Sequence, residues 1–243
     1  MNYLTYNREE RDLCAHLFRL LLEDQPHWGP LRHFIGTDIV DNPRIFCEVA
    51  LIRDAYYERK ERKDHKDDAQ EFLSNLCDLI ASQELGNEEV YTKFADLPES
   101  IRDPKQTHPK QIKYKLDELG LLTNLADRNV YGALQGMFNA KPDLAVFTSN
   151  KVLIYEAKYT CGFDDAQMQR TRNIGNVWAK LLYKELGFDE QPELEVYKLG
   201  MKSDQPDVSW EKVYMIAQEY WGMDDFSTRV LSKVRNMIEC EIP

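Results

Sequence analysis

The segment "KPDLAVFTSNKVLIYEAKYT", residues 141–160, constrains the fold of this chain most strongly. It holds two runs of β-branched and aromatic residues, "AVF" and "VLIY", on either side of the polar residues 148–151. Two such runs around a short polar stretch predict a β-hairpin. Whether the loop uses two or four of these residues, Phe147 then lies opposite Val152.

This register brings three charged side chains together at the open end of the hairpin. Asp143 lies opposite Glu156, with Cβ atoms about 4.5 to 5.5 Å apart, and Lys158 follows two residues later on the same face. Two carboxylates at the end of an apolar hairpin repel each other unless a cation lies between them. Mg²⁺ meets that need, because it takes oxygen ligands, keeps several waters and binds phosphate. A lysine beside such an ion can orient or deprotonate an attacking water, so the pattern favours metal-assisted hydrolysis of a phosphodiester.

Pro142-Asp143, the strand that follows, and Glu156-Ala157-Lys158 resemble the PD-(D/E)xK nuclease superfamily, which includes many restriction endonucleases, resolvases and DNA-repair nucleases. The resemblance implies a restriction-endonuclease-like α/β core, with a helix, three antiparallel strands, a helix and a fourth strand. It also implies that Asp143 and Glu156 bind Mg²⁺, with Mn²⁺ as a substitute, and that Lys158 is the catalytic lysine. The motif is short, and in the other interpretation Asp143 ends a turn while Glu156 and Lys158 lie on the polar face of an edge strand. The nearly continuous apolar run before Glu156 instead suits a strand covered on both faces.

Superfamily members often add an acidic residue from the first core helix, and the resemblance makes Glu10 the candidate here. The helix predicted over residues 7–24 carries leucines at helical spacing, and Glu10 shares their stripe. Glu10 is therefore a candidate catalytic and metal-binding residue that would help to hold a second metal ion. Its spacing from Asn7 is equally that of a capping box, in which Glu10 satisfies a backbone N–H. Glu48, on a second helix predicted to open at residue 42, is the fallback.

Some members also carry a glutamine on the helix after the ExK strand. The helix predicted over residues 164–186 places Gln167 on its sheet-facing stripe, which makes Gln167 a candidate catalytic residue. The spacing from Asp164 to Gln167 is also that of a helix cap. Arg170 and Arg172, one turn later, either contact phosphate or are ordinary surface residues.

The remaining pattern predicts a single α/β domain over residues 1–243, with a helical insertion before the catalytic hairpin. Residues 42–110 form the mainly helical elaboration and residues 139–202 the catalytic core. "ELEVYKLGM", residues 193–201, predicts a strand that is reached by a helical crossover, and residues from 209 onward predict two closing helices.

Charge and composition limit the partners and the location. The chain has 31 Lys and Arg against 42 Asp and Glu, a net charge of −11, which argues against a protein that coats nucleic acid by bulk charge. Any nucleic-acid contact is therefore expected to be local. The 5 cysteines include no CxxC pair and are predicted to be reduced thiols. No apolar stretch approaches the roughly 18 residues that a membrane span requires, so we expect no membrane partner and a cytoplasmic location.

Together these features predict a Mg²⁺-dependent nuclease with DNA as the favoured substrate. Cleavage of both strands of a duplex needs two such sites, which favours a homodimer. The acidic net charge favours a protein partner that supplies targeting, or a narrow basic groove. One alternative is a catalytically idle member of the same fold that binds nucleic acid or assists assembly, and another is a purely structural or protein-binding domain.

Overall fold

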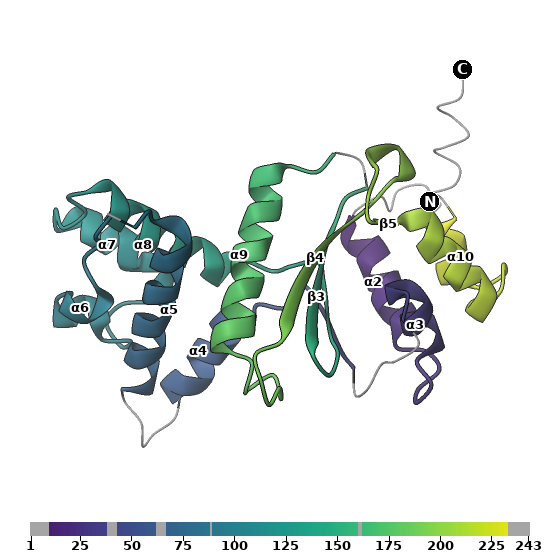
Figure 1. Ribbon diagram of the computed structural model, residues 1–243, viewed down its shortest axis with the longest axis horizontal. Coiled ribbons are helices and arrows are strands. Elements are labelled where there is room, and N and C mark those ends of the chain that lie inside the picture. Colours follow the sequence, from purple (N-terminus) through teal and green to yellow (C-terminus); the bar gives the residue numbers. More distant parts are fainter. Residues whose placement is uncertain (1–9, 38–42, 62–66, 88, 160–161, 233–243) are drawn as a thin grey trace. The chain divides into compact units, whose positions relative to one another are not determined.

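The computed structural model describes residues 10–37, 43–61, 67–87, 89–159 and 162–232 (Figure 1). The chain divides into two compact units. The sheet unit comprises the described parts of residues 1–49, 142–172 and 192–243, and the helical unit those of residues 50–141 and 173–191. The predicted single domain, with 42–110 as its elaboration and 139–202 as its core, stays a prediction.

The sheet unit is built around a five-stranded mixed sheet in the order β1-β2-β3-β4-β5. The first three strands are antiparallel, and the last two run parallel to the third. Their bounds are β1 (Arg44–Cys47), β2 (Leu144–Phe147), β3 (Lys151–Ala157), β4 (Glu193–Gly200) and β5 (Val208–Ser209). The fold is thus α/β, with a mixed sheet flanked by helices.

The predicted hairpin has the predicted register. Phe147 pairs with Val152, and Leu144 pairs with Tyr155 at the open end. Continued by one step, this register places Asp143 opposite Glu156, as the sequence indicated. The predicted strand after the crossover is also confirmed, and β4 pairs with the whole of β3.

Among the described residues, five helices of the sheet unit flank this sheet. They are α2 (Glu10–Leu21), α3 (Gly29–Ile35), α10 (Trp210–Trp221), α11 (Phe226–Leu231) and the first turns of α9 (Asp165–Leu181). The two closing helices were predicted, whereas α9 ends earlier than the predicted residue 186.

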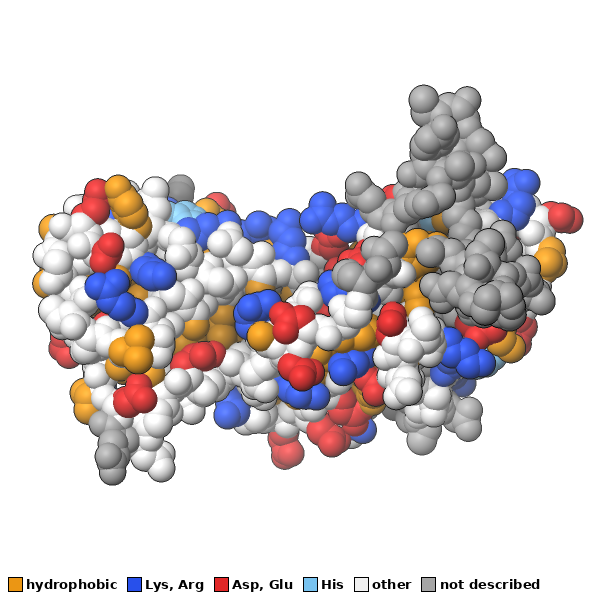
Figure 2. Space-filling model, turned by 90° about the horizontal axis from the view of Figure 1, so that it is seen from above, with side chains coloured by type: hydrophobic (Ala, Val, Ile, Leu, Met, Phe, Trp, Pro, Cys, Tyr) orange, Lys and Arg blue, Asp and Glu red, His pale blue; other side chains and the backbone are white. Residues whose placement is uncertain are grey.

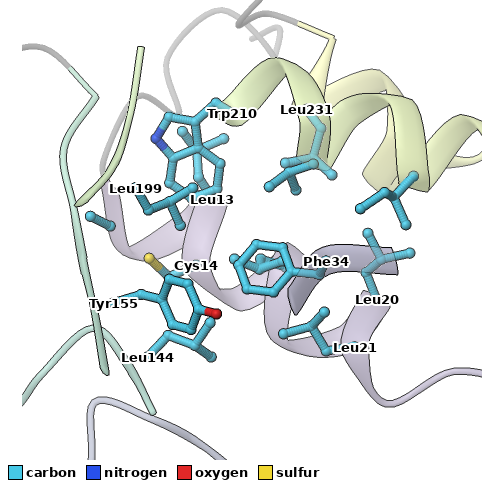
Figure 3. Packing of buried hydrophobic residues seen from close by; sticks show 14 of the residues in the cluster. Leu13, Cys14, Leu20, Leu21, Phe34, Leu144, Tyr155, Leu199, Trp210 and Leu231 are labelled. Carbon is cyan, nitrogen blue, oxygen red and sulfur yellow. The ribbon is translucent and has the colours of Figure 1, made fainter. Parts of the chain in front are cut away.

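The main core lies between one face of the sheet and the helices α2, α3, α10 and α11 (Figure 3). Leu144, Tyr155 and Leu199 project from the sheet toward Phe34 and Trp210. Full burial of such side chains contributes roughly 1.5 to 3 kcal/mol each. Because side chains alternate along a strand, the buried Tyr155 leaves its neighbour in β3, Glu156, on the opposite face.

Residues 44–47 correct one prediction: they form strand β1, not part of a helix that opens at residue 42, which itself lies outside the described residues. Ile45 and Phe46 fit a short strand as well as a helix, and pairing with β2 supplies their backbone hydrogen bonds. Glu48 then adopts a left-handed conformation with φ 51°, which ends the strand, and α4 begins only at Leu51.

The helical unit contains α4 (Leu51–Glu61), α5 (Asp68–Glu84), α6 (Glu99–Arg102), α7 (Ile112–Glu118), α8 (Leu125–Asn139), the later turns of α9, and the short turns η1 (Phe94–Asp96) and η2 (Pro109–Gln111). Its buried side chains include Phe72, Leu76, Val130, Leu134 and Phe138. Asp127 is also buried, and its carboxylate accepts hydrogen bonds from the N–H and hydroxyl of Thr92. Within the described residues, no helix is both long enough and apolar enough to cross a membrane.

Candidate active site

Glu156 lies near the end of β3 and is held there by two donors from the crossover helix. Its side chain accepts a hydrogen bond from Thr171 Oγ1 on Oε2, at 3.1 Å, and another from Gln167 Nε2 on Oε1. Only 8% of Glu156 is exposed. Gln167 therefore contacts the predicted site, while the side chain of Asp164 accepts from the N–H of Ala166.

Asp143 is fixed to the same strand by its side chain. Its Oδ2 accepts a hydrogen bond from the backbone N–H of Ala157 at 2.8 Å. Asp143 immediately precedes β2, so this bond closes the open end of the hairpin across the gap between the two strands. The interpretation of Asp143 as a simple turn residue does not account for this contact.

Lys158 places its ammonium group between two carboxylates. Its Nζ lies 3.8 Å from Glu156 Oε1 and 3.7 Å from Glu10 Oε2, and 14% of the side chain is exposed. Its backbone is held on both sides, because its N–H donates to Leu199 O and its carbonyl accepts from Trp210 Nε1. The buried core thus fixes the main chain that carries the lysine.

Glu10 is the first described residue of α2, and it reaches the site. Its Oε1 accepts a hydrogen bond from the N–H of Tyr159 at 3.1 Å, and its Oε2 is the oxygen close to Lys158. The alternative role as a capping box with Asn7 involves a residue outside the described part of the chain.

Glu48 also lies beside the site. Its backbone N–H donates to Asp143 O at 3.3 Å, and its Oε1 pairs with Arg11 Nε at 2.9 Å. Arg11 follows Glu10 on α2, so this ion pair links the start of that helix to the end of β1. The structure therefore brings both acidic candidates to the same end of the sheet.

The ionised forms of Asp143 and Glu156 are both disfavoured at the site. Burial raises the pKa of Glu156 to about 7, and repulsion from Asp143 adds to the rise, against the opposing effects of Lys158, Thr171 and Gln167. Burial likewise raises the pKa of Asp143, which its hydrogen bond from Ala157 and the charge of Lys158 partly offset. A further cation placed between the two carboxylates would favour their ionised forms.

The donor set fits a hard divalent cation that keeps part of its water shell. Within the described ranges, no three Asp, Glu, His or Cys side chains are arranged to hold a metal ion as they stand. Mg²⁺ is usually held by one or two carboxylates together with water and substrate phosphate, so a third protein ligand is not required. Asp143 and Glu156 provide that pair, whereas Glu10 is engaged by Tyr159 and Lys158.

Thr171 is the side chain at the site that the sequence analysis did not single out. It follows Gln167 by four residues and therefore lies on the same helix face, which is a signal that could have identified it. Arg170 and Arg172 are exposed on α9, and their contact with phosphate stays a prediction.

No family model, curated protein or solved structure matches this chain. The fold and the site together define an α/β protein in which Asp143, Glu156 and Lys158 meet at one end of a mixed sheet.

Proposed function

We propose that this chain is a Mg²⁺-dependent nuclease of the PD-(D/E)xK type that hydrolyses phosphodiester bonds, with DNA as the favoured substrate. The observation that carries the proposal is the meeting of Asp143, Glu156 and Lys158 where β2 and β3 open. Such a cluster is costly to build, because it takes two carboxylates out of water beside each other. A metal-binding role gives a physical reason for that cost.

The order of elements supports a restriction-endonuclease-like core. Along the chain, α2 and α3 precede β1, helices α4 to α8 lie between β1 and β2, and the antiparallel strands β2 and β3 are followed by α9 and the parallel strand β4. Apart from the helices inserted between β1 and β2, this order matches the one that the resemblance implies: a helix, three antiparallel strands, a helix and a fourth strand.

Each side chain can be given a role in hydrolysis. Asp143 and Glu156 would hold the Mg²⁺ ion, which when bound supplies Lewis-acid stabilisation and a more acidic water. Gln167 and Thr171 orient the Glu156 carboxylate. Lys158 would orient the attacking water, or offset the negative charge that develops on the phosphoryl oxygens during in-line attack.

Glu10 acts on Lys158 rather than on the substrate in this proposal. At 3.7 Å from Nζ, its carboxylate attracts the ammonium group and positions it at the site. A role for Glu10 at a second metal ion remains part of the wider proposal, because among the described residues the other oxygen of its carboxylate accepts a single hydrogen bond, from the N–H of Tyr159.

The second candidate function is a catalytically idle module that binds nucleic acid or assists assembly. The favouring observation is that both oxygens of Glu156 already accept hydrogen bonds and one oxygen of Asp143 does too. Metal binding would then require these carboxylates to exchange protein donors for the ion.

Incubation of the purified protein with plasmid, single-stranded DNA and RNA tests these functions. We expect cleavage with Mg²⁺ or Mn²⁺, none with EDTA, and none in Glu156→Gln or Lys158→Ala. Lys151→Ala, which removes a lysine at the opposite end of β3, should cleave normally. Cleavage that persists in both site variants would defeat the proposal, and binding without cleavage would favour the idle module.

The proposed homodimer would supply two sites for a double-strand cut, and a targeting protein partner would offset the acidic net charge of −11. Double-strand breaks that appear with second-order dependence on protein concentration would support the homodimer.

A further inference from the structure

A group of basic side chains lies in the helical unit, separate in sequence from the candidate active site. Residues 105–115 contain four lysines and no acidic residue, in a chain whose net charge is −11. Lys110 donates its backbone N–H to His108, Lys105 donates its backbone N–H to the neighbouring Asp103, and the charge of Lys60, at the end of α4, acts on both groups. On the face drawn in Figure 2, Lys and Arg side chains form small groups among acidic and apolar ones. A local group of this kind is where an acidic protein can bind a polyanion.

The hydrogen bonds of His108 define its protonation. Its Nδ1 accepts from the backbone N–H of Lys110 at 3.1 Å, so Nδ1 carries no proton. The proton of the neutral ring is then on Nε2, which lies 2.8 Å from the hydroxyl oxygen of Tyr57 and donates to it. Because that oxygen is the acceptor, the Tyr57 O–H is not used in this bond and can donate to an anion.

The charges around the ring agree with this assignment. Burial lowers the pKa of His108, and the positive charges of Lys110 and Lys60 lower it further, so the ring stays neutral near pH 7. Lys60 Nζ also lies 6.0 Å from the centre of the Tyr57 ring. The backbone N–H of Lys110 bonds to the His108 ring and Lys60 Nζ lies near the Tyr57 ring, so both lysines lie beside the Tyr57–His108 pair.

Asp103 lies among these lysines and reduces their net charge. Its carboxylate is already used locally, because it accepts from the backbone N–H of Lys105 at 2.9 Å and from Gln106 Nε2 at 2.7 Å. Lys60, Lys105 and Lys110 carry three positive charges against the one carboxylate of Asp103, and the hydroxyl of Tyr57 lies beside them, hydrogen-bonded to the His108 ring.

We propose that Tyr57, Lys60, Lys105 and Lys110 form a binding site for the phosphate backbone of a nucleic acid. Lysine ammonium groups contact phosphates without reading sequence, and a phenol donates to a phosphate oxygen in the same way. The choice of nucleic acid as the polyanion rests on the proposed nuclease function. The site would add substrate affinity without specifying sequence.

The binding experiment uses the full chain in EDTA, so that no cleavage is required. Fluorescence anisotropy with a labelled DNA duplex over a range of salt concentrations gives the slope of log K against log[salt]. Lys105→Gln/Lys110→Gln should reduce the magnitude of this slope by about 1.8, at about 0.9 for each lost phosphate contact. Tyr57→Phe should weaken binding by a few-fold and leave the slope unchanged, because it removes a donor and no charge.

The matched control is Lys151→Gln/Lys180→Gln, which removes the same charge from other exposed or paired lysines. It should leave the slope nearly unchanged, and circular dichroism should show that all variants are folded. An equal fall in slope in both double variants, or no fall in Lys105→Gln/Lys110→Gln, would overturn the site. Lysine-dependent binding to phosphatidylserine vesicles with no binding to DNA would also overturn it, in favour of a lipid surface.

The two proposals can fail separately. DNA binding that depends on Lys105 and Lys110, without any cleavage, would support this binding site and contradict the proposed nuclease function. DNA cleavage with binding that does not depend on these lysines would support the nuclease function and contradict this binding site.

Discussion

Replacement of Glu156 by Gln should stabilise the protein at alkaline pH while it abolishes the proposed activity. Burial and the charge of Asp143 raise the pKa of Glu156 from the ordinary 4.5 to about 7. Below pH 4.5 the group is protonated in both the folded and the unfolded chain, so it has no pH-dependent effect there. Between pH 4.5 and 7 the unfolded chain ionises while the folded chain stays protonated, and folding stability is lost over this window.

The size of the effect follows from the same shift. At 1.36 kcal/mol for each pH unit, the raised pKa of Glu156 lowers the free energy of unfolding by roughly 3 kcal/mol at pH 8 and by about 1 kcal/mol at pH 5. Gln has the shape of Glu without the charge. Gln167 and Thr171 can still bond to it, because an amide and a hydroxyl each donate and accept. The lost attraction to Lys158 makes the stability gain smaller than this full value.

Urea denaturation in EDTA at pH 5 and pH 8 measures the effect. The gain in unfolding free energy for Glu156→Gln should be greater at pH 8 than at pH 5 by about 2 kcal/mol. Glu195→Gln is the control and should lower the free energy of unfolding, because hydrogen bonds from Lys151 and Tyr197 lower the pKa of Glu195 and stabilise its charged form. A gain for Glu156→Gln that is the same at both pH values, or larger at pH 5, would refute the reasoning.

Three further variants follow from the same contacts. Lys158→Met should reduce cleavage by about 100-fold or more. It should also raise the pKa of Glu156, which single-turnover rates across pH would detect. An unchanged rate would exclude a catalytic role for Lys158. Thr171→Val removes a hydrogen bond that lowers the pKa of Glu156, so the rise of activity with pH should move to higher pH, and an unmoved profile would contradict this role. Gly200→Ala would place a Cβ 2.8 Å from Phe163 Cε2, so thermal denaturation should show a loss of roughly 1 to 3 kcal/mol. An unchanged melting temperature would show that the Phe163 ring moves aside freely.

The register of the hairpin could be predicted from sequence because it depends on local features. Two apolar runs and a short polar loop fix which residues face each other, and the alternation of side chains then places Glu156 and Lys158 together. The opposition of Asp143 and Glu156 needs no knowledge of distant segments.

Strand β1 could not be predicted in the same way. Four residues are too few for periodicity to separate a strand from a helix, and Ile45 and Phe46 fit both. What decides the conformation is pairing with β2, a segment about one hundred residues away in sequence, and the left-handed residue Glu48 that ends the strand. The helix that the sequence predicted at Glu48 was wrong for the same reason.

The contacts of Glu10 also depend on long-range packing. Its helical stripe indicated that it could face the sheet, but its hydrogen bond to Tyr159 requires that α2 begin beside the end of β3. Thr171, in contrast, lay within reach of local reasoning, since its spacing from Gln167 is a single helical turn.

Calorimetric titration with Mg²⁺ and Mn²⁺ tests most directly whether Asp143 and Glu156 bind one divalent cation together. We predict one ion per chain at pH 8, with proton release when the titration is repeated near pH 7, where Glu156 is partly protonated. Asp143→Asn and Glu156→Gln should each abolish binding, and Glu195→Gln should not. Undiminished binding in the Asp143→Asn/Glu156→Gln double variant, or no binding by the unaltered chain, would contradict the proposed metal site.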